Sequence, residues 1–327
     1  MKRHKGFGYA KYGYIFCIPF VLAFLFFSLY PTIFTALLGF TDSKGLGNTN
    51  FHFLAEPFQN FVTIWNNKTF QTSLGNTVTI WMMNFVPQVL LALLLTEWFT
   101  GASVKMKGQG FFKVAYYLPN TITAASIAIL FYALFGFPMG PVNDLLKLLG
   151  APPFDFLISK AASRQIVAFI QFWMWYGYTM IILISGVLGI NPELFEAANI
   201  DGANRLQVFF RITIPNLRTI LLFMLITSMI GGLQMFDIPR LFHTLPGGPD
   251  NATLTASLFI YNQAFAGSYM YNRASAASMM MFAVIALASA LIFFLMRDKG
   301  EARAAKQERM LVKSARQAAK EAGRQSV

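Results

Sequence analysis

The sequence is poor in the groups that most enzymes use for chemistry. It has one cysteine, three histidines and only 14 Asp and Glu among 327 residues. One cysteine excludes a disulfide within the chain, and His4, His52 and His243 are too scattered to suggest a metal site. No HExxH, GxSxG or Gly-Lys-Ser/Thr phosphate loop occurs. We therefore predict no catalytic residue, no metal and no cofactor bound by this chain.

Charge is also scarce, whereas apolar residues are abundant. Only 12% of the residues are charged, 56% are hydrophobic and the mean hydropathy is +0.51. A water-soluble domain cannot bury or solvate this balance, so the sequence indicates an integral membrane protein in contact with lipid. The net charge of +12 would suggest nucleic acid in a soluble protein. Here most of the excess flanks apolar runs, where it orients the chain, and we predict no nucleic-acid partner.

Apolar runs long enough to cross a bilayer recur six times. A helix needs about 20 residues to span the hydrocarbon core, and the runs cover residues 14–40, 76–99, 111–135, 166–188, 219–242 and 276–296. The first run is too long for a secretory signal core and lacks a small-residue cleavage site, so we expect it to be retained. The predicted fold class is an all-α membrane protein with six transmembrane helices.

The distribution of Lys and Arg predicts which side of the membrane each loop faces. With the N-terminus inside, 19 of the 26 Lys and Arg are cytoplasmic and seven lie outside, which favours both termini in the cytoplasm. Residues 1–13 then form a cytoplasmic segment and residues 14–296 the six-helix domain. The basic tail, residues 297–327, is predicted to be cytoplasmic, either as a helix on the inner leaflet or as a partly disordered tail.

One loop on the predicted cytoplasmic side has clear helix signals. This segment, residues 191–215, we call the knuckle. Asn191 is a capping residue at the start of its first helix, and Gly202 marks the end of that helix. Residues 204–212 have helical apolar spacing, and Pro215 is predicted to end this second helix. We expect the knuckle to project from the membrane as a helix, a glycine turn and a helix.

Polar and aromatic residues within the spans suggest a path for a solute. In the fourth span Gln171, Trp175 and Tyr178 lie at i, i+4 and i+7, which places an amide and two rings on one helix face. Such a face suits sugars, because amides bond hydroxyl groups and rings pack against a pyranose. The alternative is an aromatic belt or gap filling between helices. Asn84 and Gln88 in the second span are weaker candidates, whose alternative is polar contact between helices.

The fifth span contributes a second polar stretch, with Ser228, Gly232, Gln234 and Asp237 as candidate pathway residues. The glycine could instead mark a kink or close helix packing, and the serine could bond its own backbone. For Asp237 an ion pair with Arg240 is an equal alternative.

The knuckle resembles a loop of a known family, the EAA loop of the permease subunits of binding-protein-dependent ABC importers. The matching residues are Glu196, Ala197 and Ala198, then Asp201, Gly202 and Ala203, then Ile212, Ile214 and Pro215. More of the chain resembles the maltose-type, MalF-like carbohydrate branch, through Phe236 with Asp237 and through residues 245–249. The resemblance covers nearly all of the chain except the tail. It departs from the branch after the loop, where Ile214 replaces the usual leucine and Leu217 stands in a region that usually has a second proline.

This resemblance implies a MetI-like permease fold in a bacterial or archaeal plasma membrane. It implies that the coupling loop, residues 191–217, contains a helix that docks into a cytoplasmic ATPase, with Glu196, Ala197, Ala198, Asp201, Gly202, Ala203 and Pro215 as coupling residues. The implied partners are a second homologous permease, two ATPase subunits that use ATP and Mg²⁺, and an external solute-binding protein that delivers a sugar or oligosaccharide.

Two other functions are open at this point. An ABC permease for another small solute would keep the mechanism and change the cargo, although phosphate would call for a strongly cationic pathway. A self-contained carrier driven by protons or sodium would need an ion-coupling site at the bilayer midplane. Apart from Glu97 at the end of the second span, Asp237 is the only acid within the spans, and this scarcity and the lack of a visible repeat argue against that carrier.

Overall fold

The computed structural model describes residues 10–47, 50–101, 107–245, 247–267, 269–296 and 310. Most of segment 1–13, Lys105 and the predicted tail 297–327 apart from Met310 lie outside these residues. The described part of the chain is helical and contains no strand; Thr41 and Phe53 form an isolated antiparallel bridge.

Five of the six predicted spans are confirmed as apolar helices long enough to cross a membrane. They are Tyr12–Leu38, Lys68–Thr100, Lys160–Leu188, Arg218–Leu241 and Tyr271–Met296. The first combines α1 (Ala10–Phe24), a π-helical turn (Leu25–Leu29) and α2 (Tyr30–Leu38), and the next two are α4 (Lys68–Thr100) and α8 (Lys160–Leu188). The fourth combines α12 (Arg218–Leu233) and α13 (Asp237–Leu241), and the last is α15 (Tyr271–Met296).

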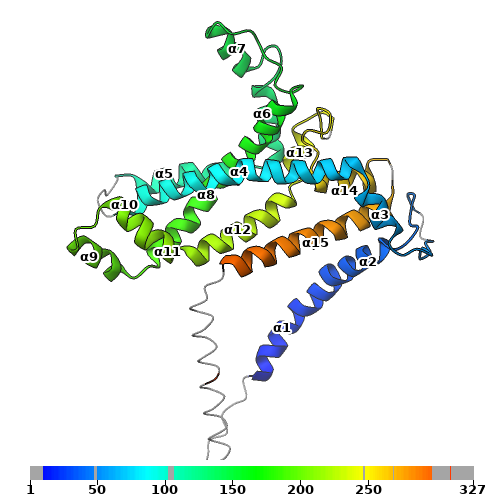
Figure 1. The fold of residues 1–327 in the computed structure, drawn as a ribbon, viewed down its shortest axis with the longest axis horizontal. Helices are drawn as coiled ribbons and strands as arrows, with labels where there is room; N and C mark the ends of the chain where they lie inside the picture. Colours follow the sequence, from blue (N-terminus) through cyan, green and yellow to red (C-terminus); the bar gives the residue numbers. More distant parts are fainter. Residues whose placement is uncertain are drawn as a thin grey trace, which may run out of the picture.

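The predicted span 111–135 is not one straight helix. It consists of α5 (Gln109–Tyr117), a 3-10 turn (Leu118–Thr121) and α6 (Ala124–Leu134), with a bend of 92°. Pro119 lies in the first turn of the 3-10 segment and has no N–H to continue the α-helix. Thr123 then starts α6 by accepting a bond from the Ser126 N–H. As a result α6 and the following α7 (Pro141–Leu148) leave the bundle sideways (Figure 1).

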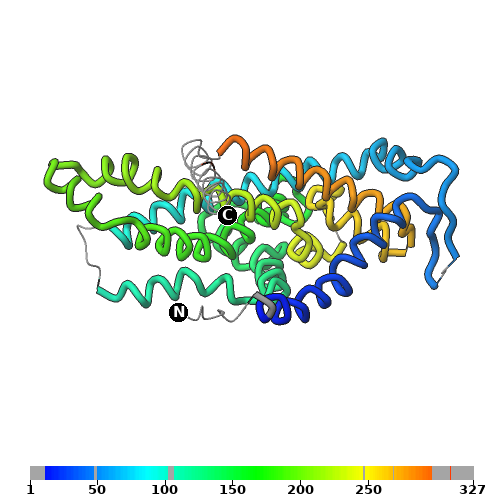
Figure 2. Tube along the Cα trace, turned by 90° about the horizontal axis from the view of Figure 1, so that it is seen from below, coloured from blue at the N-terminus to red at the C-terminus, as the bar shows by residue number. Residues whose placement is uncertain are grey.

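The spans α4, α8, α12 and α15 run roughly along one axis, with the knuckle at one end and α3 (Gln59–Trp65) at the other, whereas α1 runs obliquely away from them (Figure 1). α4 and α8 run side by side and in parallel: Arg164 bonds Asn76 near their starts and Gln88 bonds Thr179 further along. α14 (Ala256–Phe265) packs against α15 and α4. Figure 2 shows α1 and α5 along one flank of the bundle and α15 along the opposite flank.

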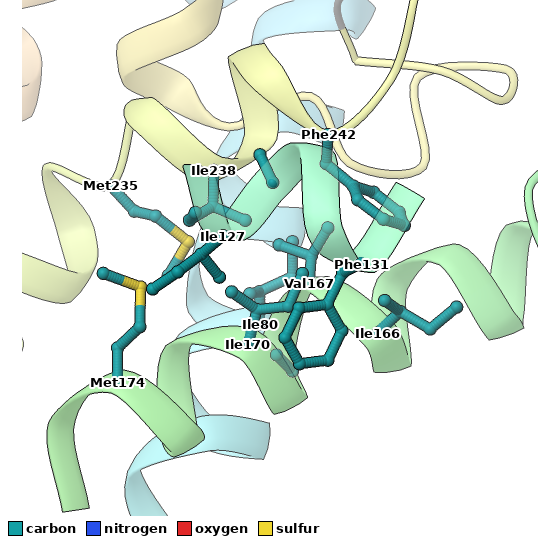
Figure 3. Packing of buried hydrophobic residues seen from close by; sticks show 12 residues of the cluster. Ile80, Ile127, Phe131, Ile166, Val167, Ile170, Met174, Met235, Ile238 and Phe242 are labelled. Carbon is teal, nitrogen blue, oxygen red and sulfur yellow. The ribbon is translucent and has the colours of Figure 1, made fainter. Parts of the chain in front are cut away.

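A buried apolar cluster holds the bent helix against the bundle. Ile127 and Phe131 of α6 pack with Val167 and Ile170 of α8 and with Ile238 of α13 (Figure 3). Each of these side chains is at most 7% exposed. Burial of a large aliphatic or aromatic side chain contributes roughly 1.5–3 kcal/mol. This cluster therefore fixes α6 and α13, the two helices that each follow a break in a span, relative to α8.

Candidate functional site

A cavity of about 460 Å³ lies between α4, α8 and α12 and extends to the break before α13. All eight residues predicted to face a solute pathway line this cavity: Asn84, Gln171, Trp175, Tyr178, Ser228, Gly232, Gln234 and Asp237. They come from three spans that are distant in sequence, and helix packing brings them together.

On α4, the cavity-lining residues Trp81, Asn84, Phe85 and Gln88 follow the spacing i, i+3, i+4 and i+7, so they share one helix face. The Gln88 side-chain N–H donates to the Thr179 hydroxyl on α8 at 2.7 Å, which is the interhelical polar contact considered as an alternative. The Asn84 amide instead donates to the Ile80 carbonyl of its own helix at 3.0 Å. Both amides are buried.

Trp81 is a cavity residue that our sequence reasoning missed. Its indole N–H donates to the Ser228 hydroxyl at 3.3 Å, so the polar contact of that serine is with α4. A Cβ on Gly232 would overlap the Trp81 ring, so glycine is needed there for close packing of α12 on α4. The i, i+3 spacing of Trp81 and Asn84 is the signal that could have found it.

The α8 wall of the cavity is aromatic and partly open. The rings of Trp175 and Tyr178 meet edge to face with centroids 5.7 Å apart, and the two residues are 42% and 40% exposed. Gln171 lies one turn earlier and is half-buried. This side of the cavity is therefore accessible within the single chain, and it presents rings next to an amide.

Among the described residues that line the cavity, Asp237 is the only charged one. It is the first residue of α13, directly after the break that follows Gln234. The expected alternative, an ion pair with Arg240, is not formed; within the described residues Asp237 makes no salt bridge, and the Arg240 guanidinium lies over the Tyr261 ring. No three His, Cys, Asp or Glu of the described chain are grouped as metal ligands.

The first half of the knuckle folds as predicted. The Asn191 side chain accepts from the Glu193 N–H at 3.1 Å and begins α9 (Pro192–Ile200). Gly202 has φ +72°, a conformation that costs a residue with a Cβ about 1–2 kcal/mol. The Ala203 N–H bonds the Ala198 carbonyl at 2.9 Å and the Gly202 N–H bonds Asn199 at 3.1 Å. These two bonds satisfy helix-end carbonyls and form a Schellman turn.

The second half of the knuckle differs from the prediction. α10 (Arg205–Val208) passes into a π-helical turn (Phe209–Thr213) and then α11 (Ile214–Asn216). Pro215 therefore does not end the helical run, because it lies in the first turn of α11, where a missing N–H is tolerated. Pro215 also lies apart from the other six predicted coupling residues, which are in α9 and in the glycine turn that ends it.

The outer surface of α9 is free within the chain. Glu196 and Ala197 are exposed and Ile200 is 87% exposed, whereas Ala198 is buried. Figure 1 shows α9 at the extreme end of the molecule, beyond the ends of α8 and α12. α9 thus offers a short apolar and acidic face to a partner.

Comparison with known proteins identifies the family. Residues 64–304 match the model of the family described as "Binding-protein-dependent transport system inner membrane component". The chain belongs to this family. As a permease it is a transport subunit rather than an enzyme, as predicted, and it is a multi-pass inner-membrane protein. Membership in this family also rules out the alternative of a self-contained carrier driven by protons or sodium.

Related permeases match over most of their length. The chain is 30% identical to the lactose transport system permease protein LacF of Rhizobium radiobacter, covering 88% of this chain and 94% of LacF. It is 30% identical to the arabinooligosaccharides transport system permease protein AraP of Bacillus subtilis, covering 79% and 80%. A bacterial ABC transporter that imports the acidic polysaccharide alginate has a chain with the same fold. Its TM-score is 0.74 at 24% identity, with 87% of this chain and 94% of that chain covered.

Proposed function

We propose that this permease passes an uncharged sugar or oligosaccharide through the cavity between α4, α8 and α12. One observation carries the proposal: the cavity combines amides with aromatic rings on facing helices. Gln171 and Gln234 can donate to and accept from sugar hydroxyls. Trp175 and Tyr178 offer faces on which the apolar side of a pyranose can pack.

The charge of the cavity supports an uncharged cargo. Asp237 contributes one carboxylate, and no Lys, Arg or His of the described part of the chain lines the cavity. A phosphate or an acidic sugar would meet this negative charge without a compensating cation, which is unfavourable where water is limited. The chain is also similar to permeases of a lactose and an arabinooligosaccharide transport system, which supports a carbohydrate as the cargo.

We further propose that the knuckle docks into a cleft of a cytoplasmic ATPase. Glu196, the exposed face of α9 and the tight turn at Gly202 give a rigid contact. ATP and Mg²⁺ are bound by the ATPase pair, whose closure would move two such knuckles together and rotate the attached spans. In this proposal the knuckle and both termini of the chain lie in the cytoplasm.

The proposed assembly contains a second permease, two ATPase subunits and an external binding protein. α1 and the following π turn bury none of their described side chains within the chain, from Tyr12 to Leu29. An apolar helix of this kind can pack against lipid or another subunit. The open α8 side of the cavity, at Trp175 and Tyr178, supports a second permease that completes the pathway.

A binding assay on the companion binding protein tests the cargo. We expect the binding protein to bind a neutral mono- or oligosaccharide from a panel that also contains uronic acids, amino acids and phosphate. Binding is measured by calorimetry. Retention of an amino acid or phosphate with no sugar bound would overturn the sugar assignment and favour the other ABC solute class. Retention of uronic acids alone would overturn the charge argument.

A further inference from the structure

An ion pair joins the knuckle to α4, a helix that is distant from it along the chain. Arg205 Nε lies 2.7 Å from Glu97 Oε1, and Arg205 Nη2 donates to the Glu97 backbone carbonyl at 2.7 Å. Charge-assisted bonds of this length are among the stronger ones in proteins. Arg205 is the first residue of α10 and Glu97 lies in the last turn of α4.

The surroundings of the pair hold its geometry. The Glu97 side chain is 17% exposed and that of Arg205 is 39% exposed, so the pair is shielded more than a typical surface salt bridge. A Cβ on Gly101 would lie 2.8 Å from Arg205 Nη2, so the glycine leaves room for the guanidinium. Both charged residues border a cavity of about 320 Å³ between α4, the end of α8 and the knuckle.

The pair connects the knuckle to a wall of the transport cavity. The knuckle continues directly from α8 and into α12 along the chain, whereas α4 has no such connection to it. α4 carries Trp81 and Gln88 into the cavity. It is one helix through Pro87, and Glu97 follows Gln88 by nine helical positions, about 13.5 Å along the helix axis.

We infer that Arg205 and Glu97 form a strut that makes α4 move with the knuckle during transport. They act as positioning residues: a displacement of the knuckle pulls or pushes the end of α4, and α4 transmits it to Trp81 and Gln88. Coupled movement of distant elements is carried by packed side chains and by hydrogen-bonded or ion-paired contacts, and this pair adds a direct charged contact between the knuckle and α4 to the packing of α4 on α8. The inference rests on the proposed role of the knuckle as the ATPase contact.

A cargo-independent measurement tests the strut. Spin labels are placed at Leu90→Cys on α4 and Leu206→Cys on α10, both at exposed positions, with Cys17→Ala in the complete complex with its sister permease and ATPases. The distance between the labels is measured by pulsed electron resonance without nucleotide and with ATP and vanadate. We expect the same distance in both states for the native pair and a changed or broadened distance after Arg205→Glu. A nucleotide-dependent distance in the complex with the native pair would overturn the strut.

Charge reversal gives the functional test. Glu97→Arg and Arg205→Glu are each expected to lower import per ATP hydrolysed by about fivefold or more, with ATPase assembly unchanged, measured with radiolabelled lactose in proteoliposomes. The double reversal should restore at least half of the native ratio, since it re-forms the pair. Arg218→Glu is the matched control, because Arg218 lies outside the coupling loop, is exposed and makes no salt bridge within the described residues. No rescue in the double variant would count against the strut.

Two further variants separate possible failures. Glu97→Gln keeps the side-chain shape and removes the charge, so it is expected to show an intermediate loss even if the reversals assemble poorly. Glu196→Lys tests the knuckle itself. If Glu196→Lys abolishes coupling while Glu97→Gln and both reversals leave it intact, the strut fails and the proposed function stands. If Glu196→Lys also leaves coupling intact, the ATPase contact lies elsewhere. Both the strut and the proposed docking of the knuckle are then overturned.

Discussion

The cavity and the knuckle reach their geometry by different routes. The knuckle is built from a continuous stretch in which each turn is closed by bonds between residues at most five apart, such as Ala203 to Ala198. The cavity is built from single residues on three spans, joined by contacts such as Trp81 to Ser228 and Gln88 to Thr179. A local structure depends on few residues, whereas a shared wall is supported by many. A single substitution should therefore reduce import strongly in the knuckle and more weakly in the cavity.

The largest effect is expected at the glycine turn. Gly202→Pro forces φ toward −65° at a residue with φ +72°, at a cost of about 3 kcal/mol or more, and Glu196→Lys reverses the exposed acid of α9. We expect both to reduce import to background or to prevent co-purification of the ATPase. Gly202→Ala is the matched control and should retain part of the activity, because its strain is about 1–2 kcal/mol. If Gly202→Pro and Glu196→Lys both left import and ATPase co-purification unchanged, the expected difference between the knuckle and the cavity would be wrong.

A strong effect is expected where the cavity has its closest packing. Gly232→Leu would displace the Trp81 ring and fill part of the cavity, so import should fall by about tenfold to a hundredfold in an assembled complex. The neighbouring Gly231→Ala is a precise control, since a Cβ there meets no atom within 4 Å. Equal import by the two variants would show that the path does not pass Gly232.

Moderate effects are expected from the polar and aromatic walls. Tyr178→Ala and Gln234→Ala each remove one sugar contact, so each should lower import by about threefold to tenfold, with the complex still assembled on size-exclusion chromatography. Phe169→Ala, an exposed α8 residue outside the cavity lining, should have no such effect. Normal import in both Tyr178→Ala and Gln234→Ala would place the pathway on other helix faces.

The smallest effect on import is expected from the buried bond between α4 and α8. Gln88→Leu leaves the Thr179 hydroxyl without its partner, at a cost of about 1–3 kcal/mol in the free energy of unfolding. Adding Thr179→Val removes both partners and should recover part of that loss. Thermal unfolding of the detergent-solubilised complex measures both values. A double variant less stable than Gln88→Leu would show that Thr179 has another role.

The sequence predicted the first half of the knuckle better than its second half and better than the third span. Caps at Asn191 and Gly202 depend on neighbouring residues, so they could be identified without a fold. The 92° bend after α5 and the continuation of the helical run through Pro215 were missed. In both places a proline interrupts the usual hydrogen bonds, and packing around it decides whether the chain turns or continues.

The eight candidate pathway residues were chosen mainly for their polarity, because a polar side chain in a span needs a partner or water. They line one cavity, and their contact with a solute stays a prediction. Trp81 was missed, because an aromatic residue in a span is equally compatible with lipid, packing or a pathway. The partners of Gln88 and Ser228 could not be predicted, since 91 and 147 positions separate the paired residues.

By itself the sequence determined that this chain lies in a membrane, how many apolar runs it has and where the knuckle begins and turns. These features follow from run length, charge and hydrogen bonds between neighbouring residues. Only the tertiary structure decided that Arg205 meets Glu97, that Gly232 accommodates Trp81 and that eight scattered residues line one cavity. Such contacts depend on how whole helices rotate and pack, and that is fixed by the summed burial of many side chains.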